Sequence, residues 1–152
     1  MKLLDILKKG AIIPQLAARH KKAVLDELCA RVAELEGLDK NPLLNVLLDR
    51  EKLGSTGIGE GIAIPHGKSN KVKELTVACG RSREGVEFDS MDGAPTHLFF
   101  LLLAPENTAG VHLKALAKIS RLLKDPSFRQ EFMAARDADE MLELVASRDS
   151  EF

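Results

Sequence analysis

The chain has 152 residues, of which 30% are charged and 45% are apolar, and its formal net charge is -1. A chain of this length can bury a core without disulfides or metal ions, and this composition is not that of a disordered segment or a protein that coats nucleic acid. We therefore expect a single domain over residues 1–152 and no nucleic-acid partner.

The first part of the chain predicts one strand and two helices. Residues 11–14, AIIP, are typical of a short strand. Apolar residues at helical spacing predict a helix over 21–36, with a glycine as its end. The stretch 39–54, DKNPLLNVLLDREKLG, predicts a second helix with Asn41 as its N-cap and Pro42 as its first helical residue.

The second part predicts two strands and three helices. Residues 75–80 and 97–104 are rich in Val, Thr, Phe and Leu, and the second run favours a central strand covered on both faces. Helical spacing resumes over 111–124, and further helices are expected from Pro126 and from DADE at 137–140. The apolar face of the first of these helices is expected to carry Leu113, Leu116, Ala117 and Leu123.

This order of elements predicts the fold class. Helices before, between and after the strands indicate an α/β fold, a three-layer α/β/α domain in which helices cover both faces of a mixed sheet. Functional sites in such folds collect on the loops at strand ends.

The cysteines and the apolar runs bear on the cellular compartment of the protein. Cys29 and Cys79 lie far apart within apolar patterns, which favours buried, reduced thiols over a disulfide or a CxxC redox pair. The longest apolar run, 98–104, is too short to cross a bilayer, and the first ten residues lack the long apolar core of a signal peptide. We expect a cytoplasmic protein with no membrane span.

The stretch 55–67, STGIGEGIAIPHG, is the most constrained segment of the sequence. Its glycines fit neither GxxxxGK[ST] nor GxGxxG, which disfavours nucleotide binding, and no GxSxG elbow is present. The four histidines show neither HxxxH nor HxH spacing, which disfavours a metal site, although folding could still bring two of them together. No cofactor is expected. A tight turn with a surface histidine and a loop with a reactive histidine both remain open.

A reactive histidine has definite requirements. A neutral imidazole is nucleophilic near physiological pH, but one ring nitrogen must be free while the other donates a hydrogen bond. Phosphoryl oxygens in turn need N–H groups and a cation. Pro65 and Gly67 would hold His66 in a rigid loop, while Ser55 and Thr56 supply hydroxyl groups.

The stretch 49–68, DREKLGSTGIGEGIAIPHGK, resembles the signature of the mannitol/fructose-type enzyme IIA domains of the bacterial phosphoenolpyruvate-dependent phosphotransferase system. The resemblance covers essentially the full chain, including GVEFDSMDGAPTHLFFLLLAPENTAGVHLKALAKIS, and it points to the nitrogen-type regulatory members. It implies that His66 is phosphorylated, that His112 is the second active-site histidine, and that Arg50 lies near the phosphate.

These implied roles are physically reasonable. His112 falls in the first turn of a predicted helix, where unpaired N–H groups and the positive dipole end favour an anion. The guanidinium fork of Arg50 suits phosphoryl oxygens better than a point charge would. The residues expected to support the phosphate loop are Ser55, Thr56, Pro65 and Gly67.

The resemblance also implies partners and a function. A small histidine-phosphorylated carrier protein (HPr-like) would act upstream, and the regulatory targets would include potassium-transport or sensor-kinase proteins. We expect a phosphocarrier that works as a nitrogen/potassium-type regulatory switch, rather than a free-standing enzyme for a small molecule. One alternative is a sugar-specific enzyme IIA that passes phosphate to a IIB domain for fructose or mannitol uptake, and another is a binding module that never accepts phosphate.

Docking of these partners is expected to be transient, through an apolar patch around His66. The candidates for that patch are Ile58, Ile62 and Ile64, which the sequence alone assigns equally well to the core.

Overall fold

The computed structural model describes residues 1–149, which form a six-stranded sheet and five α-helices. In chain order the elements are η1 (Leu3–Asp5), β1 (Leu7–Ile13), α1 (Lys21–Glu36), α2 (Lys40–Lys52), β2 (Gly57–Gly59), β3 (Ile62–Ala63), β4 (His66–Lys68), β5 (Thr76–Val86), β6 (Thr96–Ala104), α3 (Ala109–Lys124), α4 (Pro126–Ala134) and α5 (Ala138–Asp149). The predicted order of strands and helices is thus confirmed, with three short strands added in the glycine-rich segment.

The sheet is mixed, and β6 lies at its centre. The strand order is β1-β5-β6-β3-β2, and β4 also pairs with β6. β5 runs antiparallel to β6, whereas β3 and β4 run parallel to it. As a result, the carboxyl ends of β4 and β6 meet at the same edge of the sheet.

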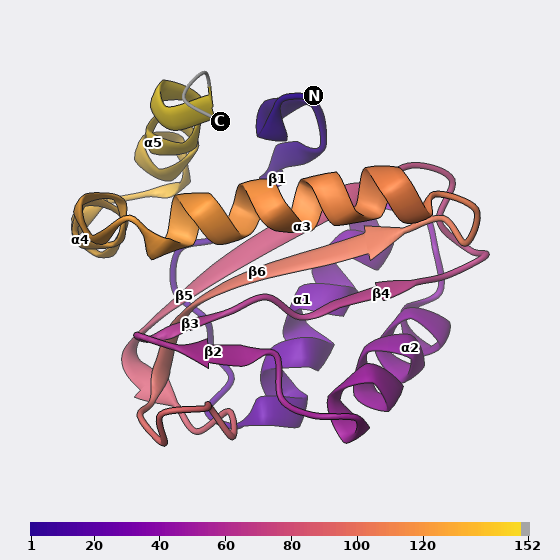
Figure 1. Ribbon diagram of the computed structural model, residues 1–152, viewed down its shortest axis with the longest axis horizontal. Helices are drawn as coiled ribbons and strands as arrows, with labels where there is room; N and C mark the ends of the chain where they lie inside the picture. The colour runs from indigo at the N-terminus through magenta and orange to yellow at the C-terminus, as the bar shows by residue number, and fades with distance from the viewer. Residues whose placement is uncertain (150–152) are drawn as a thin grey trace.

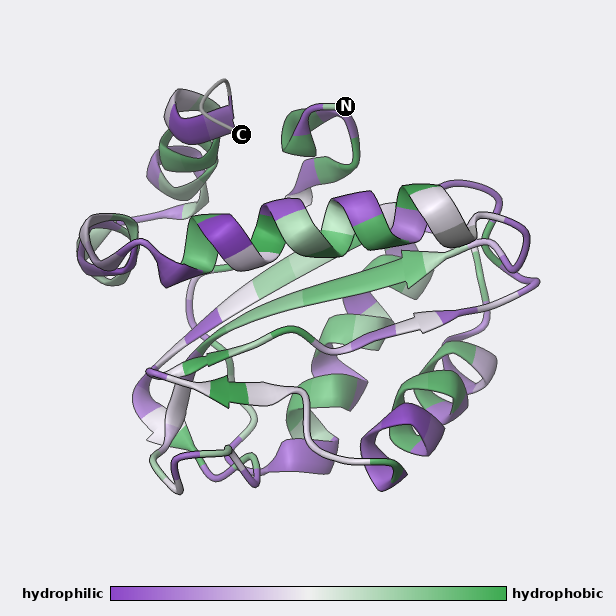
Figure 2. Cartoon of the chain, in the orientation of Figure 1, coloured by the Kyte–Doolittle hydropathy of each residue, from purple (hydrophilic) through white to green (hydrophobic). Residues whose placement is uncertain are grey.

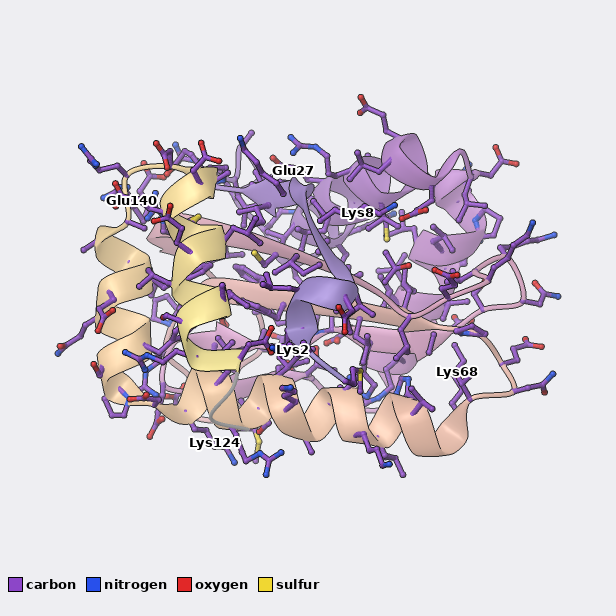
Figure 3. The ribbon with its side chains drawn as sticks, turned by 90° about the horizontal axis from the view of Figure 1, so that it is seen from above. Lys2, Lys8, Glu27, Lys68, Lys124 and Glu140 are labelled. Carbon is purple, nitrogen blue, oxygen red and sulfur yellow. The ribbon has the colours of Figure 1, made fainter. Side chains whose placement is uncertain are left out.

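Helices cover both faces of this sheet, as predicted. Figure 1 shows α1 and α2 behind the strands and α3 in front of them. Figure 3, seen from above, shows the strands between the α1/α2 layer and α3. α5 packs against β1 and η1, so the end of the described chain lies beside its beginning. The architecture is a three-layer α/β/α sandwich.

The central strand is apolar because both of its faces are covered. Every residue from Leu98 to Ala104 is at most 1% exposed. β6 is accordingly green over most of its length in Figure 2, while α3 alternates between hydrophobic and hydrophilic residues. Burying each such Leu or Phe side chain contributes about 1.5–3 kcal/mol, so β6 supplies a large share of the hydrophobic core.

Two predicted boundaries are corrected by the structure. β1 begins at Leu7, before the predicted AIIP segment. α2 begins at Lys40 with Asp39 as its N-cap, so the prediction of Asn41 as the cap is wrong. Pro42 therefore lies third in the helix, a position that its missing N–H still permits because the first four N–H groups have no partner within the helix.

The buried face of α3 also differs from the prediction. Leu113 is 65% exposed and Ala117 is exposed, while Leu116 is partly buried. The helix packs on the sheet through Ala115, Ile119, Leu122 and Leu123. Apolar residues lie on more than one side of α3. The side that packs against the sheet is the one on which His112 is also buried.

Arg81 joins two distant segments inside the protein. It is 2% exposed, and its guanidinium donates hydrogen bonds to the carbonyl oxygens of Pro14, Phe132, Met133 and Ala135 at 2.6–3.2 Å. These carbonyls replace the water that a buried cation loses, and they hold the end of α4 against the segment after β1.

The two cysteines are free thiols that are completely buried, as predicted. Burial raises the pKa of Cys29 to about 12 and raises the pKa of Cys79 as well. Within residues 1–149, no helix is both long enough and apolar enough to cross a membrane.

Candidate functional site

His66 begins β4, at the edge of the sheet that receives the end of β6. Ile62 pairs with Leu98 and His66 with Leu102, so β3 and β4 follow β6 in one unbroken register. Pro65 interrupts the strand between them, although its carbonyl still accepts a hydrogen bond from Leu102 N–H at 2.9 Å. A proline without an N–H suits such an outer strand. Its hydrogen bond helps to keep His66 in register with Leu102 of β6.

One ring nitrogen of His66 is engaged with the backbone. Nδ1 lies 2.8 Å from the carbonyl oxygen of Ile64, and the ring is half-buried. A carbonyl oxygen can only accept, so the proton of a neutral ring resides on Nδ1. Nε2 then carries the lone pair that a nucleophilic histidine requires.

His112 lies beside this ring, in the first turn of α3. The ring centroids of His66 and His112 are 5.7 Å apart and the ring planes are inclined by 56°. His112 is only 6% exposed, and its Nδ1 is buried without a hydrogen-bond partner among the described residues. Nε2 is therefore the atom of His112 that can meet a group bound at His66.

The surroundings keep both rings neutral. Burial lowers the pKa of His66, and the charge of Arg50 lowers it further, while the hydrogen bond to Ile64 and the charge of Glu51 act in the opposite direction. Burial also lowers the pKa of His112, with His66 and Lys68 adding to the effect. Figure 3 shows Lys68 near the start of α3. Near neutral pH the site thus holds two uncharged imidazoles among cations.

Arg50 lies in the last turn of α2, within electrostatic reach of His66. Its Nη1 donates to the carbonyl oxygen of Gly54 at 2.8 Å. That hydrogen bond ties the side chain to the loop that follows the helix and leaves the other guanidinium N–H groups for a ligand. The structure thus brings together the three residues His66, His112 and Arg50 that the sequence singled out.

The loop hydroxyls have partners inside the protein. Ser55 Oγ donates to the carbonyl oxygen of Phe88 at 2.7 Å and accepts from Gly57 N–H at 3.0 Å. Thr56 is 4% exposed, and both its hydroxyl and its N–H donate to the carboxylate of Glu51. These contacts favour a role in fixing the loop backbone over direct contact with a phosphate.

Glu51 is the site residue that sequence reasoning missed. It stands between Arg50 and Lys52 in what reads as a solvated helix end, yet it is only 9% exposed. Its carboxylate also lies 2.9 Å from Lys21 Nζ, at the start of α1. The signal available in the sequence was its place in the family-like segment directly after Arg50.

Two glycines of the segment meet specific requirements. A Cβ on Gly67 would lie 2.5 Å from Val46 Cγ1, so only glycine lets β4 lie this close to α2. Gly61 has a φ of +78°, which is in the left-handed region. Pro65 is buried between them. The two glycines therefore fix the path of the chain on each side of the proline.

The other two histidines lie outside this site. His97 Nδ1 is 2.9 Å from the carbonyl oxygen of Ser82, and His20 is the N-cap residue of α1. Within residues 1–149, no three His, Cys, Asp or Glu side chains are grouped so that they could hold a metal ion.

The isoleucines of the loop belong to the core. Ile62 and Ile64 are 1% and 6% exposed, and Ile58 packs against the core from a partly buried position. Exposed apolar side chains do occur on the segments that carry Arg50 and His112: Leu53, Val111 and Leu113 are 84%, 46% and 65% exposed. These three residues are therefore better candidates for an apolar docking surface than the isoleucines.

Comparisons with known proteins agree with this geometry. A family model described as "Phosphoenolpyruvate-dependent sugar phosphotransferase system, EIIA 2" matches residues 5–148. The chain is 44% identical over 146 residues to the nitrogen regulatory protein of Bradyrhizobium diazoefficiens, which covers 96% of this chain and 95% of that protein. It is also 36% identical over 150 residues to the PTS system fructose-specific EIIABC component of Bacillus subtilis, covering 98% of this chain but 24% of that protein.

A solved structure shows the same fold. The crystal structure of the nitrogen regulatory protein IIA-Ntr from Neisseria meningitidis matches with a TM-score of 0.88 and 38% identity, over 93% of this chain and 97% of that one. The family model spans the segments that carry His66, His112 and Arg50. The chain therefore belongs to the EIIA 2 family of the phosphoenolpyruvate-dependent sugar phosphotransferase system.

Proposed function

We propose that the protein is a phosphocarrier in which Nε2 of His66 accepts a phosphoryl group from a histidine-phosphorylated carrier protein of the HPr type. The observation that carries this proposal is the 2.8 Å contact between His66 Nδ1 and the carbonyl oxygen of Ile64. That contact frees Nε2 beside His112 and Arg50.

The proposed transfer exchanges one P–N bond for another. The lone pair on His66 Nε2 attacks phosphorus, and the electron pair of the breaking P–N bond returns to the donor's ring nitrogen. Positive charge develops on the His66 ring, and the Ile64 carbonyl stabilises it through Nδ1–H. In this proposal, Arg50 and the Nε2–H group of His112 would donate hydrogen bonds to the phosphoryl oxygens.

The phosphoryl group would then act as a regulatory signal. It adds roughly 1.5 to 2 negative charges at neutral pH. The group would sit beside His112, whose chain neighbours Val111 and Leu113 are exposed, so it would change which protein surface can dock there. We propose nitrogen/potassium-type regulatory targets, such as potassium-transport or sensor-kinase proteins, which the resemblance to the nitrogen-type members implies. The 44% identity to the nitrogen regulatory protein of Bradyrhizobium diazoefficiens supports the nitrogen-type assignment.

A second candidate function uses the same histidine. The similarity to a fructose-specific EIIABC component supports a sugar-specific enzyme IIA that passes the phosphoryl group to a IIB domain. Mixing the phosphorylated protein with IIB domains separates the two. Rapid transfer to a IIB cysteine or histidine would favour sugar uptake, whereas phosphorylation-dependent capture of a regulatory protein would favour signalling.

The phosphocarrier proposal is tested by labelling from phosphoenolpyruvate, with the first enzyme of the system and an HPr-type carrier present. We expect an acid-labile, base-stable phosphoryl group that disappears in His66→Ala. His97→Ala is the matched control, because it removes another half-buried imidazole whose Nδ1 also contacts a carbonyl. Full labelling of His66→Ala, or no labelling of the unmodified protein, would rule the proposal out.

A further inference from the structure

We propose that Glu51 is a positioning residue that sets the tautomer of His66 through Thr56 and Ile64. The consequence for phosphoryl transfer rests on the function proposed above. The tautomer itself is a property of the unphosphorylated protein and is measurable without any donor.

The first link is a pair of hydrogen bonds from Thr56 to the carboxylate of Glu51. Glu51 Oε1 accepts a hydrogen bond from Thr56 N–H at 3.1 Å, and Oε2 accepts one from the Thr56 hydroxyl. Both residues are buried, with 9% and 4% of their surfaces exposed. Because one carboxylate holds both the backbone and the side chain of Thr56, it restricts the orientation of that residue's carbonyl as well.

Lys21, in α1, forms an ion pair with the same carboxylate. Its Nζ lies 2.9 Å from Glu51 Oε1 and 4.8 Å from the centre of the Phe88 ring. It also lies 3.4 Å from the exposed carboxylate of Asp89. The ion pair offsets part of the cost of burying a carboxylate. Glu51 is thereby anchored between the start of α1 and the end of α2, which are both rigid elements.

The second link passes from Thr56 to the histidine. The Thr56 carbonyl accepts a hydrogen bond from Ile64 N–H at 3.1 Å, and the Ile64 carbonyl accepts one from His66 Nδ1 at 2.8 Å. Ile64 is 6% exposed, so its side chain restrains the residue as well. The direction of the Ile64 carbonyl therefore depends on where Glu51 holds Thr56.

Loss of this relay has a specific chemical consequence. If the Ile64 carbonyl turns away, Nδ1–H of His66 has no acceptor, and the Nε2–H tautomer gains population. That tautomer has no lone pair on Nε2, so it cannot attack phosphorus. A residue that merely stabilised the fold would change the free energy of unfolding without changing this equilibrium.

The tautomer is measured by ¹⁵N NMR of the His66 ring, assigned by the loss of its signals in His66→Ala. In Glu51→Ala and in Thr56→Val we expect the ratio of the Nε2–H to the Nδ1–H tautomer of His66 to rise roughly fivefold, the change that an ordinary hydrogen bond makes to an equilibrium. In labelling experiments, kcat should fall in proportion to the measured loss of the Nδ1–H tautomer, while the KM for the carrier stays within about twofold.

Matched variants separate the relay from general damage. Asp49→Ala removes an exposed carboxylate from the same turn of α2, where its partner is Lys52, and it should leave the tautomer unchanged. Thr56→Ser keeps the hydroxyl that contacts Glu51 and should restore the unmodified ratio that Thr56→Val loses. The Thr56 pair decides the question if Glu51→Ala does not fold.

Two results would overturn the inference: an unchanged tautomer ratio in Thr56→Val, or a shift in Asp49→Ala as large as in Glu51→Ala. A tautomer shift in a protein that the carrier never labels would leave the positioning role of Glu51 standing and refute the phosphocarrier function.

Discussion

The ring of His112 lies 5.7 Å from the ring of His66, although one side chain belongs to a helix that covers the sheet and the other to a strand within it. Both rings have a lowered pKa, so the pair is neutral near physiological pH. Of these two rings, only that of His66 has a backbone acceptor at Nδ1, and the Nδ1 atom of His112 has no hydrogen-bond partner among residues 1–149. This asymmetry predicts that His66 is the nucleophile and His112 the hydrogen-bond donor.

Substitution of His112 tests that division of roles. We expect His112→Ala to slow phosphoryl acceptance or onward transfer by about 100-fold, the usual effect of losing one donor to a developing anion. His112→Gln places an amide N–H close to the position of Nε2 and should recover part of the rate. Rapid-quench labelling measures both variants. Unchanged rates of both steps in His112→Ala would remove His112 from the mechanism.

The contribution of Arg50 to phosphoryl acceptance should depend on the shape of its guanidinium group as well as on its charge. Arg50→Lys keeps the positive charge but loses the fork that can serve Gly54 and a phosphoryl oxygen together. We expect it to lower kcat for phosphoryl acceptance by about tenfold, and Arg50→Ala to lower it further. Arg31→Lys is the control, because Arg31 Nη1 makes a similar contact with the Gly10 carbonyl at 2.9 Å, far along the chain from the site. Equal rates for Arg50→Lys and the unmodified protein would contradict the assignment.

Gly67 should not tolerate a side chain. The added Cβ of Gly67→Ala would overlap Val46 Cγ1 at 2.5 Å, so we expect the free energy of unfolding to fall by about 1–3 kcal/mol. The second substitution Val46→Ala should recover most of that loss, as denaturant titration would show. Gly110→Ala, where a Cβ meets nothing within 4 Å, is the control that should not destabilise the fold. No recovery in the double variant would mean that this contact is not the cause.

Stability should decrease as the pH falls through the histidine range. Both site histidines have a pKa below the ordinary value of 6.5 in the folded protein. The unfolded chain therefore takes up protons first, and the free energy of unfolding falls as the pH drops from about 7.5 through 6.5. Replacing His66 and His112 together by Gln should flatten this dependence in denaturant titrations between about pH 5.5 and 7.5. An equally steep slope in the double variant would assign the dependence to other groups.

Arg81 should matter for stability rather than for the site. Arg81→Met removes the buried guanidinium that donates to the carbonyl oxygens of Pro14, Phe132, Met133 and Ala135. We expect a loss of about 3 kcal/mol in the free energy of unfolding. Arg83→Met, at an exposed position two residues away, should stay within about 0.5 kcal/mol of the unmodified protein. Similar losses in both variants would show that burial of Arg81 is not the reason.

Local patterns in the sequence were sufficient for the main elements of the fold. An uninterrupted apolar run predicted β6 because a strand covered on both faces needs no polar alternation. The prediction of α1 over 21–36 was confirmed because Gly37 ends it in the left-handed conformation, with a φ of +66°. The face of α3 was predicted wrongly because Leu113 lies on a second apolar side of the helix, which docking leaves in solvent.

The candidate site was predictable only in part. Resemblance supplied His66, His112 and Arg50, but nothing local places a residue of α3 beside one of β4. The sequence left open whether the hydroxyl of Thr56 serves a phosphate or only caps the backbone, because a linear motif does not reveal that a buried carboxylate accepts its hydrogen bond. Glu51 was overlooked for the same reason, since its burial depends on how α1 packs against α2.

One histidine lies on a strand and the other on a helix that covers the sheet, so phosphoryl transfer also depends on whether the whole chain has folded. His66 is presented by β4, which depends on α2 and β6, while His112 arrives with α3 from the other layer. A partly assembled chain lacking either layer has only half of the pair. Only a fully folded copy would then be phosphorylated efficiently. A newly made or damaged copy would not be recognised by proteins that bind the phosphorylated form.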